Sequence, residues 1–133
     1  MLFQKKNYQP TGICVKKSPL QGRGVFAKTE IARGELVEAA PALYLTVEEK
    51  DILKHTSLFN YYFLVNNSRH PAVFGFGYAS FYNHSPQANA FYSFLPGKNI
   101  IQFYACKKIL PGEEITINYN GHPGDDRPVY FPE

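Results

Sequence analysis

Short β-type segments follow one another along almost the whole chain, and the turns between them leave little room for helix. A capping-box pattern, Thr46 with Glu49 three residues later, predicts one helix that runs to about Lys54. The remaining segments are β-branched or aromatic and are separated by turn sequences such as Leu95-Pro96-Gly97-Lys98. The sequence therefore predicts a mainly β fold of short curled sheets with few short helices. The predicted strands are Val25-Phe26-Ala27, Leu36-Val37-Glu38, Leu43-Tyr44-Leu45, Ala72-Val73-Phe74, Ala90-Phe91-Tyr92-Ser93-Phe94, Ile100-Ile101-Gln102-Phe103-Tyr104 and Ile115-Thr116-Ile117.

The chain contains an internal echo, in which residues 26–37 align without gaps on residues 104–115. An aromatic residue, Ala, Ile, Gly and Glu recur in the same order in both units. Each unit predicts a strand, a polar connector, a turn whose glycine can take a positive φ, and a second strand. Two copies are too few for a solenoid, so the echo indicates a repeated strand-turn-strand construction within one domain.

Length and composition indicate a single globular domain with aromatic clefts. A chain of 133 residues has room for one core. Ten tyrosines and eleven phenylalanines predict an interior and clefts with aromatic walls, which would suit a narrow channel. Two cysteines, Cys14 and Cys106, provide neither a disulfide framework nor a set of zinc ligands, so we expect a reducing compartment and no metal.

Charge and hydropathy exclude several other classes of partner. The first residues lack the apolar core of a signal peptide, and no run approaches the length that crosses a bilayer. The net charge is only +3, and the lysines are scattered in pairs and do not form one basic stripe. We therefore expect a soluble, intracellular protein, cytoplasmic or nuclear in a host, with no membrane and no direct nucleic-acid partner.

A glycine pair stands in the segment Gly22-Arg23-Gly24-Val25-Phe26-Ala27, which matches the letters of the G-x-G-x-x-A dinucleotide fingerprint. That fingerprint requires a following amphipathic helix, and no helical period follows here. Two interpretations stay open: a tight turn, or a place where the backbone approaches a ligand closely.

Two polar segments stand out as candidates for a functional site. Asn83-His84-Ser85 follows two aromatic residues, and Tyr119 ends the β-type segment that begins at Gly112. Taken singly, His84 is typical of a structural histidine and Tyr119 of a half-buried strand tyrosine. The cysteines and histidines show no spacing typical of a nucleophile with its base or of a metal site.

The order of these motifs resembles the SET-domain protein lysine methyltransferases. Gly22-Arg23-Gly24, Tyr61-Tyr62-Phe63, Asn83-His84-Ser85 and Gly112 through Tyr119 follow one another as in that family. The similarity runs from about Cys14 to Phe131 and is closest to the minimal viral and bacterial members. It implies a β-clip-like SET fold with a C-terminal pseudoknot. We accordingly expect an N-terminal segment at 1–13, a SET domain at 14–121 and a short aromatic flap at 122–133.

The resemblance also implies a set of site residues for methyl transfer from S-adenosylmethionine to a lysine. Tyr119 takes the position of the catalytic tyrosine, and no metal is required. Tyr61 and Phe63 would line the lysine channel. The residues expected to hold the cofactor are Gly22, Arg23, Gly24, Asn83, His84, Tyr130 and Phe131.

Three residues depart from the family pattern. Pro86 stands where many members have a zinc-binding cysteine, Ser80 replaces a common arginine, and Asn118 replaces an aspartate. The expected activity is protein-lysine N-methylation of a histone tail or another basic protein, with a possible homodimer. The alternative is a catalytically weak SET-like module that binds S-adenosylmethionine or a peptide.

Overall fold

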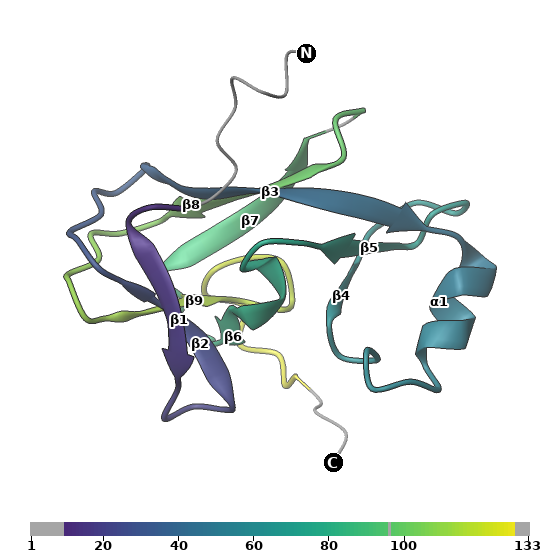
Figure 1. Cartoon of the computed structure of the whole chain (residues 1–133), viewed down its shortest axis with the longest axis horizontal. Coiled ribbons are helices and arrows are strands. Elements are labelled where there is room, and N and C mark those ends of the chain that lie inside the picture. The colour runs from purple at the N-terminus through teal and green to yellow at the C-terminus, as the bar shows by residue number, and fades with distance from the viewer. Residues whose placement is uncertain (1–9, 96, 130–133) are drawn as a thin grey trace.

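The computed structural model describes residues 10–95 and 97–129, which fold into two sheets (Figure 1). The strands are β1 (Ile13–Lys17), β2 (Arg23–Ala27), β3 (Leu36–Leu45), β4 (Tyr62–Leu64), β5 (Ala72–Gly75), β6 (Asn83–His84), β7 (Ala90–Leu95), β8 (Ile100–Ala105) and β9 (Glu114–Ile117). The four-stranded sheet has the order β1-β2-β9-β6, and the five-stranded sheet has the order β4-β5-β3-β8-β7. All pairings are antiparallel except that of β6 with β9. The predicted mainly β fold is confirmed.

The helix α1 (Val47–Leu53) begins where the capping box predicts. The Glu49 N–H donates to the Thr46 hydroxyl and the Thr46 N–H donates to the Glu49 carboxylate, each at 3.2 Å. In Figure 1 the helix lies at the end of the molecule away from the β1–β2 hairpin. No helix within the described residues has the length and apolar character that a bilayer crossing requires.

Strand β3 joins two segments that the sequence predicts as separate strands, and Pro41 explains how. The β3–β8 pairing ends at Pro41, which faces Ile100, and the β3–β5 pairing starts at Ala42. A proline has no N–H for a ladder, so it fits a point where the strand changes partner. Its carbonyl is still used, because it accepts the Phe76 N–H at 2.8 Å.

The internal echo of the sequence becomes an approximate two-fold arrangement in the structure. Ile31 and Ile109, at equivalent positions of the two units, form an antiparallel bridge and exchange both backbone hydrogen bonds, at 2.8 and 2.9 Å. The flanking bonds repeat on the two sides: Gly34 N–H to the Ala105 carbonyl and Gly112 N–H to the Ala27 carbonyl, each at 2.8 Å. Both turn glycines have positive φ, +84° and +87°, as the predicted turn requires.

The core lies between the two sheets and anchors β9 in the middle of the smaller one. Ile115 and Ile117 of β9 are fully buried. Burial of an aliphatic side chain of this size contributes about 1.5–3 kcal/mol. Strand β9 lies between β2 and β6 and is therefore held rigidly. It fixes the position of the two residues that follow it, Asn118 and Tyr119. The buried residues around it include Val25, Ala40, Ile101, Phe103 and Ile109.

Candidate active site

The two polar segments singled out in the sequence meet side by side. Strand β6 runs parallel to β9, with Asn83 opposite Thr116 and His84 opposite Ile117. The Ser85 N–H extends this pairing by donating to the Ile117 carbonyl at 3.0 Å. This two-residue parallel pairing joins segments that are distant in the sequence, and it brings Tyr119 next to His84.

Tyr119 is held at both its backbone and its hydroxyl group. The hydroxyl donates to the Tyr82 carbonyl at 2.7 Å, and the backbone N–H donates to His84 Nδ1 at 3.0 Å. Burial, with smaller contributions from Tyr61, Glu114 and Tyr92, raises the pKa of Tyr119 to about 12. The phenol is therefore protonated at neutral pH and acts as a hydrogen-bonding group, not as a base.

His84 is a neutral imidazole that supports Tyr119 from behind. Because Nδ1 accepts the Tyr119 N–H, the ring proton belongs on Nε2. Burial lowers the pKa of His84, which also favours the neutral form. The two rings lie 5.2 Å apart at an angle of 49°. His84 thus fixes the backbone of Tyr119, the residue that carries the hydroxyl group.

Asn83 connects the glycine-pair loop to β9 through its side-chain amide. Its Nδ2 donates to the carbonyl oxygens of Gln21 at 3.1 Å and Arg23 at 3.0 Å and to Glu114 Oε2 at 2.8 Å. The other Glu114 oxygen accepts the Ser18 hydroxyl at 2.7 Å. Three segments that are distant in sequence are therefore joined around one carboxylate.

The two glycines of the pair serve different purposes, which answers the choice left open by the sequence. Gly22 has a φ of +49° and no atom near the position of an added Cβ, so it is the tight-turn glycine. An added Cβ at Gly24 would overlap the Glu114 carboxylate and lie 3.0 Å from Asn83 Nδ2. Gly24 therefore allows a close approach, but of a protein side chain and not of a ligand.

A cavity of about 820 Å³ opens in front of Tyr119. Its walls are rich in aromatic residues, as the composition predicts, and the predicted site residues Gly22, Arg23, Tyr61, Phe63, Asn83 and Tyr119 line it. Gly24 and His84 do not line the cavity. Gly24 packs against the Glu114 carboxylate, and His84 accepts the backbone N–H of Tyr119. Tyr130 and Phe131 lie outside the described residues.

Several lining residues were not among the predicted site residues. Tyr92 of β7 and Phe81 line the cavity. The Tyr92 ring lies 4.9 Å from that of Phe63, and burial raises its pKa. The alternation of Tyr92 with Phe94 along a predicted strand is the signal that could have placed it. Lys50 on α1 and Lys54 at the C-cap of this helix also line the cavity, and only the fold brings the helix to this place.

Charge in the cavity wall has one sign. Arg23, Lys50 and Lys54 line it, and among the described lining residues there is no aspartate or glutamate. A wall of this kind favours a bound carboxylate and disfavours a bound ammonium group.

No group of three or more His, Cys, Asp or Glu side chains within residues 10–95 and 97–129 is placed to hold a metal ion.

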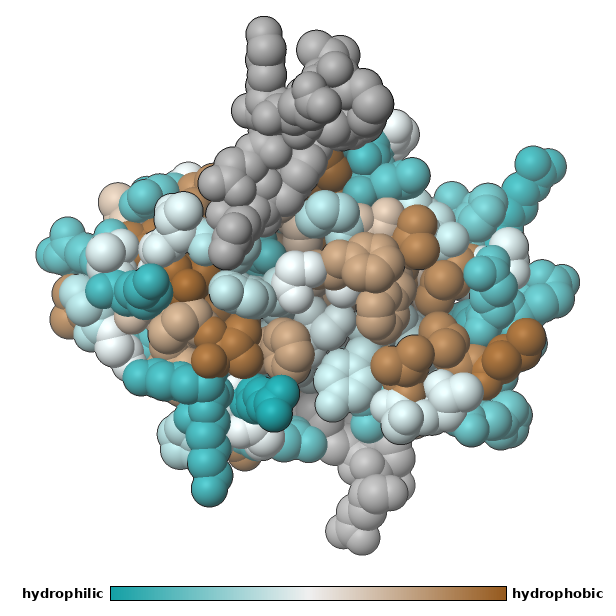
Figure 2. Space-filling model, in the orientation of Figure 1, coloured by the Kyte–Doolittle hydropathy of each residue, from teal (hydrophilic) through white to brown (hydrophobic). Residues whose placement is uncertain are grey.

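Apolar surface continues outward from the cavity. Phe59 and Leu64 line it and are also exposed, and Leu58 is exposed nearby in the chain. Figure 2 shows apolar surface gathered over the region of α1 and β4. An exposed apolar rim beside an aromatic cavity is typical of a surface that binds another molecule.

Two of the departures from the family pattern have clear structural roles. Asn118 is 2% exposed. Its amide donates to the Asp125 carbonyl at 2.7 Å and its oxygen accepts the Asn120 N–H at 2.9 Å. An aspartate could not make the first of these bonds. Ser80 lines the cavity, and its hydroxyl lies 3.2 Å from the Tyr61 carbonyl.

A model of the SET domain matches residues 22–120, which includes all four motifs. The chain belongs to the SET-domain family of protein lysine methyltransferases. The SET fold, with its curled sheets and one short helix, is therefore confirmed for this chain.

Curated relatives share sequence with this SET domain over most of its length. A Schizosaccharomyces pombe histone-lysine N-methyltransferase, specific for H3 lysine 37, is 30% identical over 118 residues, which are 83% of this chain and 79% of that protein. A Saccharomyces cerevisiae histone-lysine N-methyltransferase, specific for H3 lysine 36, is 32% identical over 126 residues. These cover 89% of this chain but only 17% of the yeast protein.

Solved structures share the fold. A Plasmodium falciparum protein assigned as a histone methyltransferase has a TM-score of 0.67 and 28% identity, covering 82% of this chain and 93% of that one. The Chaetomium thermophilum Polycomb Repressive Complex 2 bound to S-adenosylmethionine has a TM-score of 0.69 and 23% identity, covering 86% of this chain and 16% of that one. At that identity the second match supports the fold alone.

Proposed function

We propose that this SET domain transfers a methyl group from S-adenosylmethionine to a lysine of a histone or a similar basic protein. One observation carries the proposal: the Tyr119 hydroxyl, fixed by the Tyr82 carbonyl at 2.7 Å, borders an aromatic cavity that the glycine-pair loop and Asn83 also line. The cofactor and the catalytic role of Tyr119 are both part of the proposal.

The residues of the cavity fit the chemistry of S-adenosylmethionine. The volume of about 820 Å³ lies within the range of about 300–1,000 Å³ for small-molecule sites. Gly22 and Arg23 offer backbone groups, and the cations of the wall could pair with the cofactor carboxylate. The proposal also includes His84 and Gly24 as supports of this pocket, and Tyr130 and Phe131 as its cover. Bound there, the cofactor would supply a methyl group on a sulfonium, which leaves as a neutral thioether.

The chain's own residues would position the amine and keep it neutral. A free lysine has a pKa near 10.4, so most of it is charged at neutral pH. Aromatic walls at Tyr61, Phe63 and Tyr92 would desolvate the ammonium group, and the cations of the wall would repel it. Both effects lower the pKa of the substrate lysine. Alignment of the amine in the channel could contribute about 7–11 kcal/mol.

A histone-like substrate is supported by the relatives and by the surface. The S. pombe and S. cerevisiae relatives are named for histone H3 lysines. The exposed apolar rim near α1 and β4 could hold the apolar residues of a peptide. We place the chain among the minimal viral and bacterial members because Pro86 occupies the position of the zinc-binding cysteine. A histone substrate would place the protein in a nucleus.

The test is label transfer from S-adenosylmethionine to histones and to lysate proteins. We expect the parent chain to label lysine, and Tyr119→Phe to lower the rate by about 10²-fold or more, since catalytic hydrogen bonds contribute on that scale. Tyr104→Phe is the matched control, because Tyr104 stacks on Phe91 and does not line the cavity. Binding of S-adenosylmethionine without transfer to any protein would favour the alternative, a catalytically weak binding module. No binding would refute both interpretations.

Domain boundaries and oligomeric state remain predictions of the proposal. We retain a SET domain at 14–121 with a flap at 122–133, which limited proteolysis would test. A homodimer would add surface for a peptide, and light scattering during size-exclusion chromatography would detect it. A monomer that retains full activity would contradict the dimer.

A further inference from the structure

Glu38 is a buried acid outside the set of predicted site residues. It lies on β3, is 3% exposed, and follows an irregularity in the β3–β8 register between Leu36 and Glu38. Burial raises the pKa of Glu38, although hydrogen bonds from Tyr78 and Tyr82 act in the other direction. A buried acid that costs free energy to desolvate needs partners, and here both oxygens have one.

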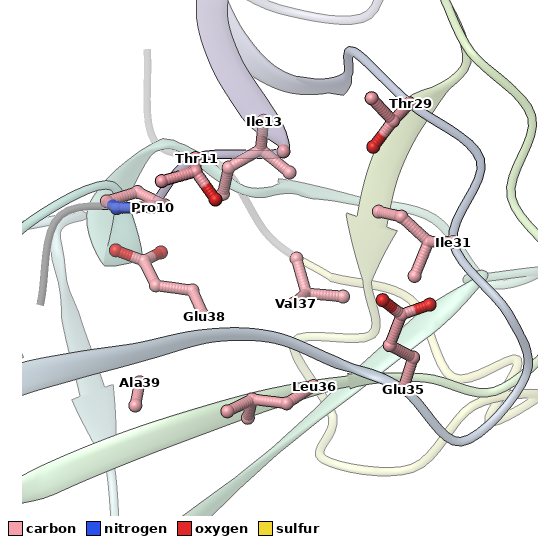
Figure 3. Close-up of a pocket in the computed structure, with 11 residues that line it drawn as sticks. Pro10, Thr11, Ile13, Thr29, Ile31, Glu35, Leu36, Val37, Glu38 and Ala39 are labelled. Atoms are coloured by element: carbon pink, nitrogen blue, oxygen red, sulfur yellow. The ribbon is translucent and has the colours of Figure 1, made fainter. Parts of the chain in front are cut away.

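The surroundings of Glu38 do not indicate a metal site. A cavity of about 310 Å³ lies beside β3, and in Figure 3 the Glu35 and Glu38 carboxylates lie apart, with Val37 between them. Glu35 is occupied by the Ala32 N–H, which it accepts at 2.7 Å. The hydrogen-bond partners of Glu38 are instead Tyr78 and Tyr82.

The two carboxylate oxygens hold the two ends of one short segment. Oε2 accepts the Tyr78 N–H at 2.9 Å, and Oε1 accepts the Tyr82 hydroxyl at 2.8 Å. Between these contacts the chain forms the short 3₁₀ turn Ala79–Phe81. The contact is close, because a Cβ added at Gly77 would lie 2.5 Å from Oε2. Glu38 therefore clamps residues 78–82.

This clamped segment ends at the carbonyl group that holds the tyrosine of the active site. The Tyr82 carbonyl accepts the Tyr119 hydroxyl at 2.7 Å. The Tyr82 ring is nearly fully buried and stacks on Phe103, with centroids 4.2 Å apart and an interplanar angle of 20°. The ring stack and the hydroxyl bond to Glu38 together leave little freedom for the backbone of Tyr82.

We propose that Glu38 is a positioning residue for methyl transfer: through the Tyr82 hydroxyl, it fixes the carbonyl oxygen that orients the Tyr119 hydroxyl. The inference rests on the proposed function, because it assigns its effect to the reacting site. Misplacement of reacting groups by about 1 Å can cost about 10²-fold in rate, so a small shift of residues 78–82 has a measurable consequence.

Tyr82→Phe is the decisive variant, since it keeps the ring stack and removes only the hydroxyl. We expect kcat to fall about tenfold or more, with KM for the histone and Kd for S-adenosylmethionine within about twofold of the parent values. Glu38→Gln should retain most of kcat, because its amide can accept the Tyr78 N–H and donate to the Tyr82 hydroxyl oxygen. Glu38→Ala can do neither and should lose as much as Tyr82→Phe.

Ile109→Ala separates positioning from general stability. Ile109 is fully buried, pairs with Ile31 at the two-fold bridge and has no part in the hydrogen bonds that join Glu38, Tyr78, Tyr82 and Tyr119, so its variant should be destabilised yet keep the parent kcat at 25 °C. Hydrogen exchange followed by mass spectrometry gives a second readout that needs no activity. Amides of residues 78–83 should exchange faster in Tyr82→Phe than in the parent or in Ile109→Ala.

The outcomes distinguish the positioning role from the proposed function. A parent chain that transfers no label to any protein refutes the proposed function, whatever the exchange data show. A parent that transfers label, together with a Tyr82→Phe variant of unchanged kcat, overturns the role of Glu38 alone. So does a loss of kcat in Tyr82→Phe that is no larger than that in Ile109→Ala.

Discussion

Replacement of Asn83 by aspartate tests the polar network that joins the glycine-pair loop to β9. The Asn83 amide nitrogen faces acceptors only: Glu114 Oε2 at 2.8 Å and the carbonyl oxygens of Arg23 and Gln21 at 3.0 and 3.1 Å. An aspartate would place a second carboxylate against Glu114. We expect a destabilisation that depends strongly on pH.

The magnitude follows from the choice between repulsion and proton uptake. Two charges about 3 Å apart repel by about 6 kcal/mol at an effective dielectric constant of about 20. Uptake of one proton is cheaper, since an aspartic acid with an unfolded-state pKa of about 3.9 costs about 4 kcal/mol to hold neutral at pH 7. The folded variant then binds one proton more than the unfolded chain, so stability is lost as pH rises. The penalty should fall to about 1.5 kcal/mol at pH 5.

Urea denaturation followed by circular dichroism at pH 5 and pH 7 measures this difference. Asn83→Ala removes the donor without adding a charge, so its loss of about 1–3 kcal/mol should be the same at both pH values. Asn66→Asp makes the same charge change at an exposed residue and should have little effect. A penalty for Asn83→Asp that is equal at pH 5 and pH 7 would refute the reasoning.

Three further predictions follow from the site. Gly24→Ala should weaken S-adenosylmethionine binding, measured by calorimetry, far more than Gly22→Ala does. Gly22→Ala should lower the stability of the fold by only about 1 kcal/mol, because of the positive φ at this position. Equal effects of the two variants on binding would contradict the different roles of the two glycines. Asn118→Asp removes the donor to the Asp125 carbonyl and should lower the free energy of unfolding by about 1–3 kcal/mol, whereas an unchanged urea midpoint would show that the bond is dispensable. Because the pKa of Tyr119 is about 12, kcat should not fall between pH 8 and pH 10, and a basic limb near pH 10 would contradict this.

Local sequence signals were enough to predict the helix and the strands β2, β5, β7, β8 and β9, whereas β1 and β4 were not among the predicted strands. The capping box predicted where α1 begins, and the echo predicted the positive φ of the two turn glycines. Strand β3 was split in the prediction, because the change of partner at Pro41 is a tertiary event. Strand β6 was not predicted at all, since a two-residue strand has no period of its own and exists only through its pairing with β9.

The order of the motifs predicted the candidate site residues, but it did not predict the residues that support them. The order of motifs correctly brought Asn83, His84 and Tyr119 together. The Glu38–Tyr82 contact has no local signal, because Glu38 lies on β3 and Tyr82 follows the 3₁₀ turn, 44 residues further along the chain. Lys50 reaches the cavity only because α1 follows β3 to the end of the larger sheet. Such contacts depend on how sheets pack, which a pattern along the chain does not contain.

The two-fold bridge between Ile31 and Ile109 has a consequence for how the protein is made. Strand β9 fills the position between β2 and β6, so both of those strands have an open edge until residues 114–117 leave the ribosome. An incomplete chain would expose these edges and leave Ile31 unburied, and unpaired edges promote aggregation. We therefore expect a nascent chain to gain its fold and its active site in a single late step, after the second unit of the echo is synthesised.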